Sequence, residues 1–253
     1  MQSLQGKIRN GKAVIGIMGL GYVGLPLALA FAKRFDTIGF DVNEKIVKGL
    51  SKGTSHIGDV ADSDIAAVIG KSFHPTTDAS RLRRCDFIIV CVPTPLKENG
   101  EPDLAYLKAA ASQIRDVLHK DMFVIIESTT YPGTTDGLIR SILEQTKLKA
   151  GKDFGLAFSP ERIDPGNPRY KVTQIPKVVG GIDKQSTETA FALYSTVIEK
   201  VYPVSNARTA EAVKMMENIF RNVNIALVNE MALVFERMEI DSWEVIEAAK
   251  TKP

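Results

Sequence analysis

Short apolar runs alternate along this chain with longer segments in which apolar residues recur at helical spacing. The apolar runs are short and rich in β-branched residues, which is typical of strands buried on both faces of a parallel sheet. They cover residues 13–18, 37–40, 87–92, 122–127, 154–158, 177–182 and 200–204, with a further short strand near residue 73. Segments of helical character lie between them. This order predicts an α/β fold with a doubly wound parallel Rossmann sheet, followed by a long connecting helix.

The first strand runs into a glycine-rich turn with the spacing G-x-G-x-x-G, and an Ala/Leu-rich helix follows. Gly19 permits the tight turn, Gly21 allows a pyrophosphate to approach the backbone, and Gly24 lets the helix lie close to the strand. Tyr22 and Val23 stand between the last two glycines. The free N–H groups at the helix start favour a phosphate. We therefore expect these five residues to bind a dinucleotide.

Asp41 ends the second strand and lies 22 residues after Gly19. An acid about 20 residues after the first glycine accepts hydrogen bonds from an adenosine ribose. Because a 2'-phosphate would be repelled by this carboxylate, Asp41 favours NAD over NADP. Lys45 stands close enough to contribute to the same part of the site and to weaken that distinction.

Two later strands also end in residues suited to ligand contact. The strand at 87–92 stops at Pro93, because proline cannot continue a ladder, and Thr94 follows in the turn. Ser128 and Thr129 come directly after the strand at 122–127. In open α/β sheets, ligands lie at the carboxyl ends of the strands, so we expect all four residues near the cofactor.

Two further pairs of polar residues are open to two interpretations from the residues alone. Thr134 and Thr135 precede a helix, and we interpret them as its caps. Glu161 and Arg162 are adjacent in a loop, which is most often a solvated surface pair. The residues themselves assign no chemistry to these positions.

One helical pattern extends from residue 206 to about residue 239, far beyond the usual helix length. Such a helix should leave the domain, to reach more protein or to pair with a second copy. Glu211, Lys214, Asn218 and Arg221 share one stripe on it, which by itself indicates a solvated face. We therefore divide the chain into a dinucleotide-binding domain at 1–204 and a region at 205–253, which holds the central or dimerisation helix and the start of the next region.

Composition excludes several classes of function. The 32 basic and 30 acidic side chains leave a formal charge of +2, and no long basic run suggests nucleic acid as a partner. Residues 1–12 are mostly polar, and this pattern predicts a loose leader segment without regular structure. No signal-peptide core precedes residue 13, and no apolar stretch approaches the roughly 18 residues of a membrane span. A cytoplasmic location without a membrane partner is the expectation.

Cysteine and histidine add no metal or disulfide site to this interpretation. Cys85 and Cys91 belong to one predicted strand, which holds their Cα atoms too far apart for a disulfide. We interpret both as small buried apolar residues. The three histidines are scattered without partners at ligand spacing, so we expect no metal.

The chain contains the segments GLGYVGLPLA, FDVN, VPTPL, ESTTYPGTT, FSPERIDPG and RTAEAVKMMENIFRNVNIALVNEMA. Together these segments resemble the UDP-glucose/GDP-mannose dehydrogenase family of nucleotide-sugar dehydrogenases. The SPER sequence followed by PG, with the long helix, looks more like the branch that acts on UDP-N-acetylhexosamines, such as UDP-N-acetylglucosamine, than the UDP-glucose branch.

The resemblance implies an activity and assigns roles to the polar residues. In that family the C6 alcohol of the sugar is oxidised twice to a carboxylate, and two NAD molecules are reduced, in a pathway to surface polysaccharides. The glycine loop, Asp41 and Thr94 would bind NAD. Thr129 would lie beside the reacting centre, and Glu161 would help to activate the hydrolytic water. Lys214 and Asn218, one helical turn apart, would hold the reacting oxygen of the sugar and stabilise its developing charge.

The family's nucleophilic cysteine lies in a glycine-rich loop after the long helix. Neither Cys85 nor Cys91 matches that cysteine, and a thiol inside a central strand is a poor nucleophile. The sugar-nucleotide domain that usually comes next is also absent from these 253 residues. We therefore expect a portion that binds NAD and forms a homodimer through its long helix, but does not complete the four-electron oxidation alone.

Three alternatives remain open at this point. The substrate could be UDP-glucose. A 3-hydroxyacid dehydrogenase would share a lysine and an asparagine on a long interdomain helix, although ESTTYPGTT and SPERIDPG argue against it. A non-catalytic NAD-binding scaffold that dimerises would tolerate alanine at Lys214 and Asn218.

Overall fold

The computed structural model of the chain describes residues 2–163 and 172–252, with the side chains of residues 2 and 3 left out. The chain divides into two compact units, Met1–Ala212 and Val213–Pro253. The part of the SPERIDPG motif at residues 164–166 lies outside the described residues. The first unit contains the sheet and the glycine-rich turn.

An eight-stranded sheet forms the centre of the first unit, in the order β3-β2-β1-β4-β5-β6-β7-β8. Neighbouring strands are parallel except for β6 and β7, which pair antiparallel. The doubly wound Rossmann sheet is thus confirmed, while the reversal of β7 and β8 is a feature that the sequence pattern did not predict. Between β6 and β7 the described residues contain no crossover helix, which a parallel return needs. The strands are β1 (Val14–Met18), β2 (Asp36–Phe40), β3 (Phe73–Thr76), β4 (Phe87–Val90), β5 (Phe123–Ile126), β6 (Gly155–Phe158), β7 (Lys177–Gly181) and β8 (Val201–Pro203).

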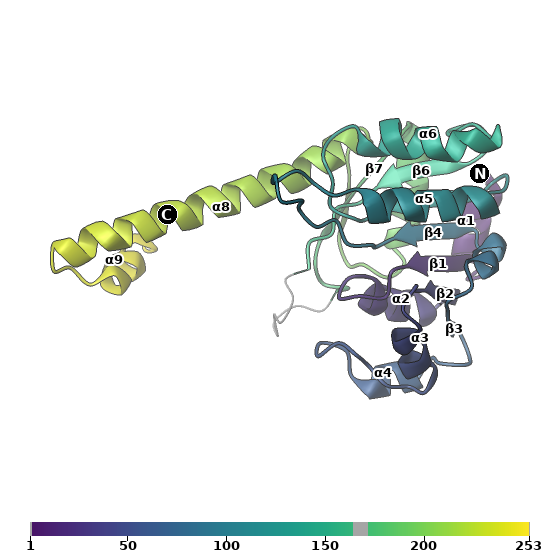
Figure 1. Cartoon of the computed structure of the whole chain (residues 1–253), viewed down its shortest axis with the longest axis horizontal. Helices are drawn as coiled ribbons and strands as arrows, with labels where there is room; N and C mark the ends of the chain where they lie inside the picture. The colour runs from purple at the N-terminus through teal and green to yellow at the C-terminus, as the bar shows by residue number, and fades with distance from the viewer. Residues whose placement is uncertain (1, 164–171, 253) are drawn as a thin grey trace. The chain divides into compact units, whose positions relative to one another are not determined.

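Helices connect the strands and pack along the sheet, as Figure 1 shows for α5 and α6. Polar side chains cap the starts of several helices. At the start of α3, for example, the side chain of Asn43 accepts a hydrogen bond from the backbone N–H of Lys45 at 3.0 Å. The helices of the first unit are α1 (Gln2–Arg9), α2 (Gly24–Ala32), α3 (Glu44–Ser51), α4 (Asp62–Ala66), α5 (Ala105–Val117), α6 (Arg140–Leu143) and α7 (Lys184–Tyr194), with shorter turns η1 (Ala79–Arg84), η2 (Thr134–Ile139) and η3 (Glu144–Thr146).

The strands β4, β5 and β6 are buried at every position. Phe87 and Phe123 are in register on the neighbouring strands β4 and β5, and their ring centroids lie 5.5 Å apart. A Cβ added to Gly155 would lie 2.1 Å from the Phe123 ring. The core is therefore close-packed at the amino ends of the strands whose carboxyl ends lead to the predicted site.

The expectation of a loose leader at residues 1–12 is wrong. Within this stretch, Gln2–Arg9 form α1, in which Leu4 and Ile8 are 1% and 3% exposed. Their spacing of four residues places both on one face of the helix, which packs against α7. The ammonium of Lys7 adds an ion pair of 2.5 Å with Asp86. Two apolar residues in a polar stretch were too weak a pattern to predict this packing.

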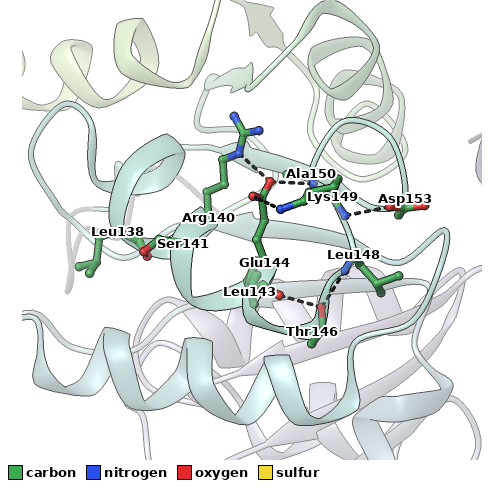
Figure 2. Close-up of polar contacts among 10 residues, drawn as sticks. All are labelled: Leu138, Arg140, Ser141, Leu143, Glu144, Thr146, Leu148, Lys149, Ala150 and Asp153. Carbon is green, nitrogen blue, oxygen red and sulfur yellow. Dashed lines mark hydrogen bonds and ion pairs between the residues drawn. The ribbon is translucent and has the colours of Figure 1, made fainter.

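A polar cluster around Glu144 closes the end of α6 (Figure 2). Its carboxylate accepts from Arg140 Nε at 2.9 Å, from Lys149 Nζ at 3.2 Å and from the backbone of Ala150 at 3.2 Å. The hydrogen bond from Arg140 lowers the pKa of Glu144. This cluster fixes the turn that leads from α6 towards β6.

The second unit consists of most of α8 (Ala207–Arg237) and of α9 (Ser242–Ala249). Its helices leave large apolar side chains exposed, among them Phe220 at 64% and Trp243 at 74%. Despite this apolar surface, none of the described helices is both long and apolar enough to cross a membrane. The α8 helix confirms the long helical pattern that the sequence predicts at 206–239.

Candidate cofactor and active site

The glycine-rich turn lies where β1 meets α2, and two of its glycines are required by close backbone contacts. Gly19 has a φ of +91°, and a Cβ on it would lie 2.7 Å from the carbonyl oxygen of Cys91. A Cβ on Gly24 would lie 1.8 Å from the carbonyl oxygen of Gly19. A Cβ on Gly21 would meet no atom within 4 Å. The backbone at Gly21 is therefore the part of the turn that a ligand can approach.

Asp41 joins the glycine-rich turn to the start of α3. One carboxylate oxygen accepts from the backbone of Leu20 at 2.8 Å, and the other accepts from the backbone of Asn43 at 2.9 Å. The carboxylate is thereby held in one orientation at the carboxyl end of β2. Each oxygen retains a lone pair that a ribose hydroxyl can use.

A cavity of about 620 Å³ extends along the carboxyl ends of the central strands. This volume lies within the range of pockets that bury a small organic ligand. Most of the residues predicted to bind the cofactor contribute to its lining. They are Gly19, Gly21, Tyr22, Val23, Asp41, Pro93, Thr94, Ser128 and Thr129.

Two predicted cofactor residues do not line this cavity. Gly24 lies within α2, directly below the turn, where it contacts Gly19. Lys45 lies in the first turn of α3 with an exposed side chain, and its backbone N–H donates to the side chain of the Asn43 cap. The structure thus gives Gly24 a role in packing and leaves Lys45 at the rim.

Ser128 and Thr129 differ in their surroundings although they are adjacent. Ser128 is 5% exposed, and its hydroxyl donates to the carbonyl oxygen of Val92 at 2.8 Å. That bond ties the end of β5 to the turn after β4, which carries Thr94. Thr129 is exposed, so its hydroxyl is available to a ligand. The two strand ends therefore form one continuous wall of the cavity.

Glu161 comes after β6 and also lines the cavity. Its carboxylate accepts a hydrogen bond from the backbone of Ile163, which folds the loop back on itself. The neighbouring guanidinium of Arg162 donates to the carbonyl oxygen of Pro176 at 2.8 Å. The two side chains therefore bind different backbone groups, and both are partly buried, so they are not a solvated surface pair.

A buried polar cluster, which the sequence pattern did not reveal, lies behind this wall. Glu127 is 1% exposed, and its carboxylate pairs with the ammonium of Lys177 at 2.9 Å. The hydroxyl of Tyr194 donates a hydrogen bond to the other side of the same carboxylate group. Burial, together with the charge of Glu127, raises the pKa of Tyr194 well above its ordinary value, so that this hydroxyl remains a donor. No spacing in the sequence connects these three residues.

The predicted caps at Thr134 and Thr135 are wrong. The carboxylate of Glu211, on the first turn of α8, accepts from the backbones of Gly133 at 2.6 Å and Thr135 at 2.8 Å. It therefore caps η2 across the fold, while the Thr134 hydroxyl donates to the carbonyl oxygen of Tyr131. Burial raises the pKa of Glu211. Glu211 thus does not belong to a solvated stripe on the long helix.

Lys214 and Asn218 lie one turn apart on the part of α8 that belongs to the second unit. Their roles towards a sugar remain predictions from the resemblance. The expectation that both cysteines belong to one strand is wrong, because they flank β4, and the interpretation as a small buried residue holds for Cys85, while Cys91 is partly buried. Cys85 is fully buried, and burial raises the pKa of its thiol to about 12. Cys91 lines the cavity, and burial raises the pKa of its thiol well above the ordinary value.

The fold and the cavity define a class of protein: a Rossmann domain that receives a dinucleotide at the carboxyl edge of its sheet. Residues 13–198 match the model of the NAD binding domain of the UDP-glucose/GDP-mannose dehydrogenase family, and residues 208–253 match its central domain. The chain belongs to this family, and NAD is its cofactor.

Curated relatives agree with this assignment. A UDP-N-acetyl-D-glucosamine 6-dehydrogenase of Pseudomonas aeruginosa is 40% identical over 240 residues, which is 94% of this chain and 56% of that protein. Protein CapL of Staphylococcus aureus is 39% identical over the same shares of both chains. The chain thus spans a little over half the length of the relatives it matches.

A solved structure extends the agreement to the fold. The UDP-D-ManNAc dehydrogenase of Pyrococcus horikoshii superimposes with a TM-score of 0.90 at 36% identity, covering 95% of this chain and 58% of that one. The shared fold includes the sheet whose carboxyl edge carries the cavity. A GDP-mannose dehydrogenase of Pseudomonas aeruginosa matches with a TM-score of 0.87 at 25% identity.

Proposed function

We propose that this chain provides the cofactor-binding part of an NAD-dependent nucleotide-sugar 6-dehydrogenase that acts on a UDP-N-acetylhexosamine, with UDP-N-acetylglucosamine as the first substrate to test. The main support is one cavity that joins the glycine turn and Asp41 to Thr129 and Glu161. Relatives that carry the names UDP-N-acetyl-D-glucosamine 6-dehydrogenase and UDP-N-acetyl-D-mannosamine dehydrogenase support the substrate class.

The cofactor is held in this proposal from its adenosine end to its nicotinamide end. Asp41, with Lys45 at the rim, binds the adenosine ribose. The glycine turn, with Tyr22 and Val23, receives the pyrophosphate on its backbone N–H groups. Thr94 and its neighbour Pro93, with Ser128 and Thr129, surround the nicotinamide. The residues follow the order of the strand ends from β2 to β5.

The proposed reaction converts a primary alcohol, two NAD⁺ and one water into a carboxylate, two NADH and three protons. Each oxidation transfers a hydride from C6 to the cofactor while a proton leaves the oxygen. Lys214 and Asn218 stabilise the negative charge that develops on that oxygen. Glu161 helps to activate the water that enters, and Thr129 contacts the reacting centre. These four are the proposed catalytic residues.

Domain organisation, assembly and location complete the proposal. Residues 1–204 bind NAD, and residues 205–253 link to the substrate-binding part and form a homodimer through α8. Exposed apolar side chains along α8 support pairing with a second copy. A cytoplasmic location and a role in making polysaccharide precursors belong to the same proposal.

Calorimetry with the 253-residue chain tests the cofactor half of this proposal. NAD should bind, Asp41→Ala should weaken it about tenfold, and NADP should bind more weakly than NAD to the unaltered chain. Asp59→Ala, at an acid in the loop before α4, is the matched control and should leave NAD affinity unchanged. Equal affinity for NAD and NADP would contradict the assigned role of Asp41.

The full-length gene product tests the catalytic half. NADH should form with UDP-N-acetylglucosamine or UDP-N-acetylmannosamine faster than with UDP-glucose or a 3-hydroxyacid. Lys214→Ala and Asn218→Ala should each lower the rate by about a hundredfold or more. Full activity of both variants would instead support a scaffold, and turnover of 3-hydroxyacids alone would support the rival dehydrogenase.

A further inference from the structure

The charges on the wall of the cofactor cavity all have the same sign. Among the described residues that line it, Asp41, Glu127 and Glu161 carry acids, and no lining side chain is basic. The phosphates of a dinucleotide are met by backbone N–H groups at the glycine turn and therefore need no basic side chain. The acidic wall instead favours a positively charged part of the ligand.

The strand order indicates which part of the cofactor meets which acid. Asp41 comes after β2, while Glu127 comes after β5, and β1 and β4 lie between these strands. An acid at the end of the second strand receives the adenosine ribose, so the nicotinamide extends towards β5. Glu127 and Glu161 are therefore the acids at the nicotinamide end.

The buried ion pair is oriented with its negative end towards the cavity. Glu127 contributes to the lining of the cofactor cavity. Glu127 also lines a separate small hollow, and its partner Lys177 lines that hollow but not the cofactor cavity. Glu127 and Lys177 are 1% and 8% exposed, so water and salt screen their charges little. Such a pair presents an electrostatic dipole to the end of the cavity.

We propose that Glu127 makes the nicotinamide end of the site discriminate between the two redox forms of the cofactor, favouring NAD⁺ over NADH. The ring of NAD⁺ carries a positive charge and the ring of NADH is neutral, while the remainder of the molecule is the same. The Glu127 carboxylate therefore attracts only the oxidised ring, and Lys177 limits the size of that attraction by its position behind the carboxylate.

This preference for NAD⁺ rests on the proposed function, and it concerns the exchange of cofactor between the two oxidations. Two hydride transfers to two NAD molecules require NADH to leave after the first transfer so that a second NAD⁺ can bind. A site that binds NAD⁺ more tightly than NADH favours the replacement of the reduced cofactor by the next NAD⁺. Glu127 acts on the cofactor alone and takes no part in proton or hydride transfer.

The test measures dissociation constants of NAD⁺, NADH and ADP-ribose by calorimetry for the 253-residue chain and its variants. Glu127→Gln leaves Lys177 without its counter-charge and should raise the ratio Kd(NAD⁺)/Kd(NADH) about tenfold. Lys177→Met removes the opposing charge and should lower the same ratio about threefold. ADP-ribose lacks the ring and serves in each variant as the reference for the rest of the site.

Opposite changes of the ratio Kd(NAD⁺)/Kd(NADH) in the two variants would distinguish an effect of charge from damage to the fold. Damage to the fold would weaken NAD⁺ and NADH together and leave their ratio unchanged. Glu144→Gln is the matched control, since it removes a carboxylate that also pairs with basic side chains but does not line the cavity (Figure 2). Its ratio should equal that of the unaltered chain.

Each outcome decides one of the two proposals. An unchanged ratio in both variants, or changes of the same sign, overturns the role of Glu127. If either single variant fails to fold, the double variant Glu127→Gln with Lys177→Met replaces the pair by neutral groups and should raise the ratio about threefold. An unchanged ratio there also overturns it. Failure of the unaltered chain to bind NAD⁺ or ADP-ribose contradicts the proposed function itself.

Discussion

The two compact units of the chain place their apolar side chains in opposite surroundings. In the first unit, Phe87 and Phe123 are fully buried within the sheet. In the second, Phe220 and Trp243 are 64% and 74% exposed. The first unit therefore satisfies its hydrophobic pattern with its own residues, whereas the second presents an apolar surface that calls for a partner. The residues of the first unit are therefore enough to bury its own apolar side chains, whereas those of the second unit are not.

The largest expected effect concerns the close contact below the glycine turn. A Cβ at Gly24 would lie 1.8 Å from the carbonyl oxygen of Gly19, and backbone cannot yield to it cheaply. Gly24→Ala should therefore lower the free energy of unfolding of the first unit by about 3 kcal/mol or more. Urea unfolding followed by circular dichroism measures this change.

Gly21→Ala is the matched control for that substitution. A Cβ at Gly21 meets no atom within 4 Å, so stability should change by no more than about 0.5 kcal/mol. NAD affinity should nevertheless fall about tenfold, because the methyl group occupies the approach of the pyrophosphate. Equal loss of stability in both variants would mean that the turn is not packed as described.

The second prediction concerns the apolar surface of α8. If a second copy covers this surface, Phe220→Glu should weaken dimerisation by about thirtyfold, because a charge replaces a large apolar contact. Sedimentation equilibrium measures the dissociation constant. Asn222→Glu adds the same charge two residues further along the helix at an exposed polar position and should have a smaller effect. A chain that is monomeric before any substitution contradicts the proposed homodimer.

The third prediction concerns Glu211, which attaches the first turn of α8 to η2. Glu211→Ala leaves the backbone N–H groups of Gly133 and Thr135 without their acceptor. The free energy of unfolding should fall by about 2 kcal/mol. Asp136→Ala, at the surface ion pair with Arg208, should cost less than about 1 kcal/mol and is the control.

The same residue gives a pH dependence of known sign. Burial raises the pKa of Glu211 above its ordinary value of 4.5, so the folded state binds the proton more tightly than the unfolded state. The contribution of this group to stability is therefore fully present below the unfolded pKa and is lost as the pH rises through the folded pKa. Glu211→Gln should remove this component of the slope. An unchanged slope would contradict the raised pKa.

The comparison of the two units also explains what the sequence could predict. Gly19, Asp41 and Thr129 were predictable as neighbours because each comes after a strand, and parallel strands end at one edge. The pairs Glu127 with Lys177 and Glu211 with Gly133 were not, because they join residues that are distant in the chain and obey no repeat. The helix α1 was missed because only Leu4 and Ile8 mark its buried face.

The smallest expected effect concerns Cys91, which lines the cavity and is the thiol closest to the proposed chemistry. Burial and the charge of Glu127 raise its pKa, so it remains a protonated thiol at neutral pH and is a poor nucleophile. Cys91→Ala should change the stability by less than about 1 kcal/mol and NAD affinity by less than about twofold. Unfolding and calorimetry measure both.

The 253-residue chain should likewise form no NADH with UDP-N-acetylglucosamine, with or without this substitution. Steady NADH formation that disappears in Cys91→Ala would instead make Cys91 the nucleophile and would place the whole oxidation within these 253 residues.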